Sequence, residues 1–179
     1  TVADSGAVEN TLLYKTYARV LRERGVRHIT VGAGDKIRFA CGAELFFVSP
    51  ERHADVPKGN EGSVAAKLVY GKTRVLFCGD LAGEGLARAV ETYGTFLRSE
   101  VLKVPHHGGN IGTGTAVKNF FDMVSPEASI ISAGRSRRYD MRKGSTGGYL
   151  RSTIYNTIND GAVVMCVSEN EYKINSFLK

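Results

Sequence analysis

Val75-Leu76-Phe77-Cys78-Gly79-Asp80 and Leu102-Lys103-Val104-Pro105-His106-His107-Gly108-Gly109 are the two stretches that say most about how this chain folds. Each begins as an apolar strand and ends in a residue type that binds metals, followed by a turn. Apolar runs of this kind gain stability by burial on both faces of a sheet. In open α/β sheets, the binding site lies where such strands end. The sequence therefore predicts one site containing a carboxylate and one or two imidazoles.

The 179-residue chain has the size of a single domain, which we expect to span residues 1–179. Its 42% hydrophobic, 23% charged composition is typical of a folded α/β protein. The net charge of +6 is compatible with a polyanionic partner. We expect no membrane span, because no apolar run approaches the length required, and no signal peptide. Three widely spaced cysteines favour buried free thiols in a reducing, cytoplasmic-type compartment.

Apolar periodicity and turn residues predict alternating helices and strands. Helices are expected over residues 11–24, 83–97, 116–124 and 149–158. Strands are expected over residues 28–31, 36–40, 44–48, 65–70, 74–78, 101–104 and 128–132, with a closing antiparallel pair at 161–167 and 172–177. The polar stretch 52–63 is expected to form an exposed loop. This order predicts an α/β fold in which helices cover a sheet.

The predicted site residues each have a structural alternative. Asp80 could cap the following helix instead of binding a metal, and the local sequence favours neither interpretation. The tandem His106-His107 favours a ligand, because two histidines between a proline and two glycines are unusual. Neighbours in an extended chain point to opposite faces, so we expect one ligand, preferably His106, with His107 supporting it. His28 and His53 lack ligand spacing, and we expect them to be structural or solvated.

Several motifs agree in their layout with a known family. They are the two stretches above, Asp4-Ser5-Gly6 with Thr11 and Tyr14, Asn60 with Ser63, Ile130-Ile131-Ser132-Ala133-Gly134-Arg135, and Asp160-Gly161-Ala162. Together they resemble the metallo-β-lactamase-fold domain of ComEC-type competence DNA-uptake proteins. The resemblance covers most of the chain. Its most specific element is Leu-Lys-Val-Pro-His-His-Gly at residues 102–108.

The resemblance implies an αββα sandwich of two halves, of which this chain carries mainly the second. It also implies zinc or manganese as cofactor, Asp80 and His106 or His107 as ligands, and Asn60 and Ser63 at the edge of the site. The family's His-x-His-x-Asp-His cluster is absent from this sequence. About three protein ligands are usual for each metal. Either the missing ligands come from outside this sequence, or the site holds no metal.

A basic stretch begins at the last residue of the motif at 130–135. It contains Arg135, Arg137, Arg138, Arg142 and Lys143, with Tyr139 among them. The family often has a further histidine just after this tyrosine, whereas this chain has Asp140-Met141. The stretch is either a solvated loop or a contact for a phosphate backbone, in which Tyr139 stacks on a base. Lys103 would add to the same positive field.

Three functions remain open. The first is part of a metal-dependent hydrolase, a phosphodiesterase or nuclease that acts on DNA with a metal-activated water and is not competent as this chain alone. The second is a non-catalytic nucleic-acid-binding or assembly domain with an incomplete metal site. The third is an ester or lactone hydrolase, because one fold hosts many chemistries. Half of a sandwich exposes a sheet face, so we expect the remainder of the domain, another subunit or self-association to cover it. The chain could also be a soluble domain of a membrane protein.

Overall fold

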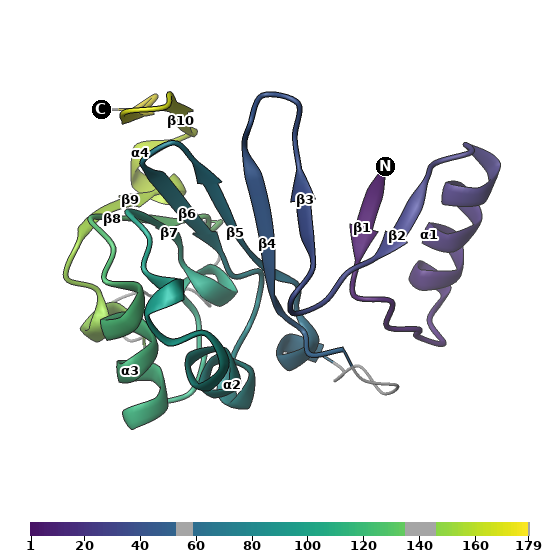
Figure 1. The fold of residues 1–179 in the computed structure, drawn as a ribbon. Coiled ribbons are helices and arrows are strands. Elements are labelled where there is room, and N and C mark those ends of the chain that lie inside the picture. Colours follow the sequence, from purple (N-terminus) through teal and green to yellow (C-terminus); the bar gives the residue numbers. More distant parts are fainter. Residues whose placement is uncertain (53–58, 135–145, 179) are drawn as a thin grey trace.

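A seven-stranded mixed sheet forms the main body of the computed structural model, which describes residues 1–52, 59–134 and 146–178 (Figure 1). Its strand order follows the sequence from β3 to β9. The strands are β3 (Lys36–Arg38), β4 (Glu44–Ser49), β5 (Ala65–Tyr70), β6 (Thr73–Phe77), β7 (Val101–Lys103), β8 (Ala128–Ile131) and β9 (Thr153–Asn156). Neighbours from β3 to β6 are antiparallel, and neighbours from β6 to β9 are parallel.

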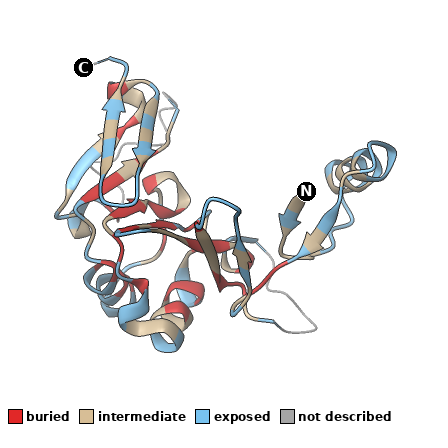
Figure 2. Ribbon diagram, turned by 45° about the horizontal axis from the view of Figure 1, so that its top comes forward, coloured by how far each residue is buried: buried red, intermediate tan, exposed pale blue. Residues whose placement is uncertain are grey.

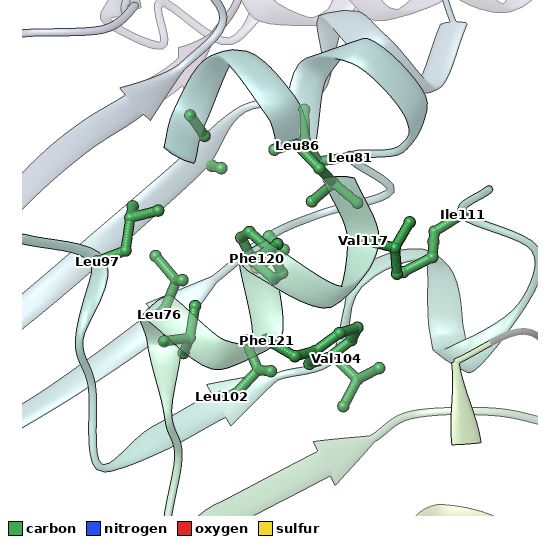
Figure 3. Packing of buried hydrophobic residues seen from close by; sticks show 14 of the residues in the cluster. Leu76, Leu81, Leu86, Leu97, Leu102, Val104, Ile111, Val117, Phe120 and Phe121 are labelled. Atoms are coloured by element: carbon green, nitrogen blue, oxygen red, sulfur yellow. The ribbon is translucent and has the colours of Figure 1, made fainter. Parts of the chain in front are cut away.

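Helices α2 (Gly83–Tyr93) and α3 (Thr115–Val124) cover one face of this sheet (Figure 1). Leu76 and Leu102 point from neighbouring strands into the same apolar core as Leu86 of α2 and Phe120 of α3 (Figure 3). All four are at most 1% exposed. Apolar burial on this scale is the main stabilising term in folding. Short helical segments complete the connections: η1 (Gly59–Gly62), η2 (Gly94–Leu97), η3 (Pro105–Gly108), η4 (Gly147–Tyr149) and α4 (Thr157–Asp160).

The C-terminal hairpin packs on the opposite face of the sheet. Strands β10 (Val163–Val167) and β11 (Tyr172–Ser176) pair antiparallel, as predicted. Their inward side chains, including Ile174, pack against Val75 and Val101. The hairpin does not cover the whole face, because Phe77, two residues along β6 from Val75, remains 44% exposed.

A small N-terminal unit stands apart from the main body in both ribbon views (Figures 1 and 2). It consists of β1 (Val2–Asp4) and β2 (His28–Thr30), which pair in parallel, and α1 (Leu12–Glu23), which connects them. The Thr11 hydroxyl caps α1 by accepting a hydrogen bond from the Tyr14 backbone N–H at 3.1 Å. No residue of α1 is buried. The unit joins the main body through Val31, which packs with Phe47 of β4.

The predicted α/β class is confirmed. A helical layer on one face of a sheet is the arrangement expected for one half of the predicted αββα sandwich. The helix predicted over 149–158 is wrong, because that region contains the strand β9. Its β-branched and aromatic residues suit a strand, and parallel pairing with β8 stabilises the extended conformation over a helix.

The three cysteines are free, but only Cys78 is buried, so the expected burial of Cys41 and Cys166 is wrong. Among the described residues, no helix has both the length and the apolar character needed to cross a membrane.

Candidate metal centre

Three parallel strands bring the predicted site residues together. Asp80 follows β6, the histidine pair follows β7, and Ser132 follows β8. Since β6, β7 and β8 are parallel neighbours, their carboxyl ends meet at one edge of the sheet. This is where open α/β sheets place their sites. Residues far apart in the chain therefore become neighbours in space; His107 and Ser132, for example, are 25 positions apart.

The turn before Asp80 requires glycine. Gly79 has a φ of +53°, a conformation that L side chains rarely adopt. A Cβ atom there would lie 3.1 Å from the Val64 carbonyl oxygen, so the space is restricted as well. The Gly79 carbonyl accepts a hydrogen bond from the His106 backbone N–H at 3.0 Å. This bond ties the carboxylate turn to the histidine turn.

Both histidines adopt left-handed backbone conformations, with φ of 47° at His106 and 56° at His107. Such conformations are uncommon for residues other than glycine and cluster at functional sites. They form the tight turn η3 rather than an extended chain. The two side chains are therefore not held on opposite faces, as they would be in an extended strand.

Backbone carbonyls orient both imidazole rings. The His106 Nδ1 lies 2.9 Å from the Asn110 carbonyl oxygen, and the His107 Nδ1 lies 2.7 Å from the Ser132 carbonyl oxygen. A neutral ring that donates from Nδ1 presents its lone pair at Nε2, the tautomer of a metal ligand. The sequence did not predict these two acceptors, because every residue has a backbone carbonyl and no residue type marks the ones that bind a side chain.

His107, rather than the preferred His106, lies beside Asp80. The His107 Nε2 is 3.3 Å from Asp80 Oδ1, and the two side chains are 43% and 44% exposed. In the Nδ1–H tautomer, a ring lone pair and a carboxylate oxygen face each other. A proton or a cation between them stabilises such an arrangement. The geometry therefore favours His107 as the partner of Asp80.

Lys103 and Ser63 lie at the same edge. The half-buried Lys103 ammonium donates to the Val104 carbonyl oxygen at 3.0 Å. Burial lowers the pKa of Lys103, while the nearby Cys78 and Asp80 oppose that shift. Ser63 lies beside the Gly79 turn, because a Cβ on Gly79 would be 3.4 Å from the Ser63 Cβ.

Asn60 is exposed on η1, and among the described residues no hydrogen bond joins its side chain to the site. The residues proposed for phosphate contact beyond Lys103 lie outside the described residues: Arg135, Arg137, Arg138, Tyr139, Arg142 and Lys143. His53 lies outside them too. His28 contacts Asp4 through its Nε2 at 2.8 Å and is distant in the fold from this edge, in the N-terminal unit.

No family model matches this chain, but two known proteins are similar to part of it. The chain is 32% identical over 118 residues to ComE operon protein 3 of Bacillus subtilis (strain 168), covering 66% of this chain and 14% of that protein. It is 32% identical over 98 residues to competence protein ComA of Neisseria gonorrhoeae, covering 55% of this chain and 14% of that protein. The resemblance to ComEC-type competence proteins is confirmed.

The chain thus matches a small part of each competence relative. Among solved structures, it is also similar to a proposed Zn-dependent hydrolase of the metallo-β-lactamase superfamily from Thermotoga maritima, with 14% identity and a TM-score of 0.38. That alignment covers 69% of this chain and 58% of the other.

The ligand set of this ComEC-like chain is incomplete within residues 1–52, 59–134 and 146–178. No group of three or more His, Cys, Asp or Glu side chains there could hold a metal ion. Asp80 and His107 could supply two donors, fewer than the roughly three protein ligands of a typical catalytic zinc site. The described residues therefore fit part of a metal site, and no catalytic step can be assigned to a metal held by them alone.

Proposed function

We propose that this chain is part of a metal-dependent hydrolase that acts on nucleic-acid phosphodiesters. Asp80 and His107 contribute two ligands, and the others come from outside the described residues. The observation that carries this proposal is the 3.3 Å approach of His107 Nε2 to Asp80 Oδ1 between two turns held in uncommon conformations. Two strained histidines and a required glycine are costly features for a purely structural turn.

The competence relatives support nucleic acid as the substrate class. One of the two relatives is named as a competence protein, and the resemblance to the ComEC type implies DNA uptake. Lys103 places a cationic side chain close to Asp80, where it could contact a phosphate oxygen. The overall basic character of the chain agrees with a polyanionic substrate.

A second function is favoured by the small number of donors. With two rather than three ligands among the described residues, the domain could bind nucleic acid or a partner without cleaving anything. In that case the Asp80–His107 contact would be an ion pair that holds the two turns together. The two functions predict different results when Asp80 or His107 is replaced: only the hydrolase loses metal affinity.

The deciding experiment is metal titration of the 179-residue chain with Zn²⁺ and Mn²⁺ by calorimetry. We expect Asp80→Asn and His107→Gln each to weaken binding at least about tenfold, because each removes one of two donors. Asp122→Asn is the matched control, since Asp122 is an exposed carboxylate that pairs with Lys118 on α3. Equal affinity in all variants, or no binding by the wild type, would favour the non-catalytic function.

Hydrolysis is tested separately with bis(p-nitrophenyl) phosphate, a small phosphodiester. Because the described residues lack a full ligand set, we expect turnover only where the missing ligands are also supplied; it should then require added metal and fall in the Asp80→Asn and His107→Gln variants but not in Asp122→Asn. Turnover that is unchanged in the first two variants would contradict the assignment of the site.

A further inference from the structure

The segment of the N-terminal unit from α1 to the start of β2 carries more positive than negative charge, whereas Asp4 and Glu9 precede it in the chain. Residues 12–28 contain five cationic side chains, Lys15, Arg19, Arg22, Arg24 and Arg27, and one carboxylate, Glu23. Glu23 pairs with Arg19 at 2.8 Å across one helical turn. The other four cations are exposed, and none forms an ion pair with a described residue. An unneutralised cluster of this kind attracts polyanions.

A hollow of about 240 Å³ lies between α1 and β2 beside these charges. Tyr14, Tyr17, Arg22 and His28 contribute to its walls. Residues three, four and seven apart share one side of a helix, so Lys15 lies on the same side of α1 as Arg22. The hollow is smaller than typical pockets for drug-sized ligands, which measure about 300–1,000 Å³. Its size and aromatic walls suit one planar group.

Hydrogen bonds hold the walls of the hollow in place. The Tyr17 hydroxyl donates to Asp4 Oδ2 at 2.5 Å, and His28 Nε2 lies 2.8 Å from the same oxygen. The Asp4 carboxylate therefore joins both strands and the helix of the unit. The hydrogen bond to Asp4, together with partial burial, raises the pKa of Tyr17 to about 12, so its phenol stays neutral. The centroid of the Tyr14 ring lies 6.2 Å from that of the Tyr17 ring, and both tyrosines line the hollow.

We propose that this face of α1 and β2 docks single-stranded nucleic acid, with phosphates on Lys15 and Arg22 and one base in the hollow against Tyr14. The proposal rests on the nucleic-acid substrate class proposed above. Aromatic side chains beside a basic surface are how proteins bind single strands with little sequence preference. Duplex DNA fits less well, because its bases are stacked on each other and cannot enter a hollow. The face would guide a strand to the protein independently of the Asp80–His107 edge.

The test measures binding of a fluorescein-labelled oligothymidylate single strand to the full 179-residue chain by anisotropy over a range of salt concentrations. For Lys15→Gln with Arg22→Gln, we expect weaker binding and a log–log salt slope smaller by about 1.4, or about 0.7 for each lost phosphate contact. For Tyr14→Leu, we expect affinity to fall at least about fivefold with the slope unchanged, because stacking is lost rather than charge. Circular dichroism confirms that each variant keeps its helices.

The matched control is Arg38→Gln with Lys173→Gln, which also removes two exposed cations, here from β3 and β11. If this control weakens binding as much as the Lys15/Arg22 pair does, net charge alone explains the binding and the proposal is wrong. Preferential binding to phosphatidylglycerol vesicles, sensitive to Tyr14→Leu, would also overturn it in favour of a membrane surface.

The outcome is separable from that of the hydrolase proposal. Hydrolysis of bis(p-nitrophenyl) phosphate does not need an extended strand, so the Tyr14 and Lys15/Arg22 variants should keep any such activity. Loss of strand binding with retained hydrolysis supports the docking face. Unchanged strand binding overturns the docking face and leaves the hydrolase proposal intact. If the chain binds the single strand specifically but neither binds metal nor hydrolyses the phosphodiester, the docking face is supported and the hydrolase proposal is wrong.

Discussion

Replacing Lys67 by methionine should stabilise this protein at neutral pH. Lys67 lies in β5 with only 3% of its surface exposed and contacts Phe96 of η2. Its ammonium donates to the Phe96 carbonyl oxygen and lies 4.4 Å from the centre of the Phe96 ring. Methionine has a similar shape and fills the same space without a charge. The variant therefore isolates the cost of burying the ammonium.

The size of the effect follows from the pKa of Lys67. Burial, with a smaller contribution from Arg74, lowers it from 10.5 to about 8. Each pKa unit corresponds to about 1.4 kcal/mol, so burial of the charge costs at most about 3 kcal/mol. The hydrogen bond and the cation–π contact to Phe96, together worth about 1–2 kcal/mol, offset part of this cost. We expect Lys67→Met to raise the free energy of unfolding by about 1–2 kcal/mol at neutral pH.

The pH dependence gives a second signature. Between about pH 8 and 10.5 the unfolded state binds the lysine proton more strongly than the folded state, so the wild type gains stability as pH rises. Below that window the penalty is complete. Methionine has no such proton, so the advantage of the variant should shrink as pH rises and be absent or reversed by about pH 10.

Urea unfolding at several pH values, followed by fluorescence of the eight tyrosines, measures both signatures in a chain without tryptophan. Lys36→Met is the matched control, because Lys36 also lies over a phenyl ring, that of Phe46, but is exposed. A Lys67→Met variant less stable than the wild type at neutral pH would refute the reasoning. So would a difference between the two proteins that stays constant with pH.

Two further predictions concern the turns and the N-terminal unit. Gly79→Ala should lower the free energy of unfolding by about 2 kcal/mol, because alanine must adopt a positive φ and its methyl group would meet the Val64 carbonyl. A decrease below about 0.5 kcal/mol in urea unfolding would show that the turn can relax. At Asp4, partial burial alone would raise the pKa, but hydrogen bonds from Tyr17, Gly6 and His28 lower it overall. The stabilisation by ionised Asp4 is therefore complete above about pH 4 and is lost as pH falls through its folded-state pKa, so the protection of α1 amides against hydrogen exchange, relative to their intrinsic exchange rates, should fall there. Asp4→Asn should abolish that acid dependence, and an unchanged acid profile in this variant would contradict the role of the carboxylate.

Local patterns predicted most elements of this fold because their signals lie within a few residues. The helix α1, Leu12–Glu23, lies within the range 11–24 that its apolar periodicity predicted. The hairpin of β10 and β11 follows from two alternating runs around a short turn. The strand β1, only three residues long, left no periodic signal and was not predicted.

The errors arose where long-range contacts compete with local ones. Residues 149–158 carry enough apolar side chains for a helical pattern, but pairing with β8 draws Thr153 and its neighbours into the sheet. The preference for His106 as the ligand stays a prediction, although the extended chain on which it rested is wrong, because these residues form the turn η3.

The amino-acid sequence by itself determined that apolar strands are followed by Asp80 and by the histidine pair, since strand propensity and the turn residues that end a strand are local features of the sequence. Only the tertiary structure decided that these ends meet, because the parallel register of β6, β7 and β8 depends on contacts between distant segments. It also decided that His107 is the neighbour of Asp80, because the Ser132 carbonyl that orients its ring comes from a third strand.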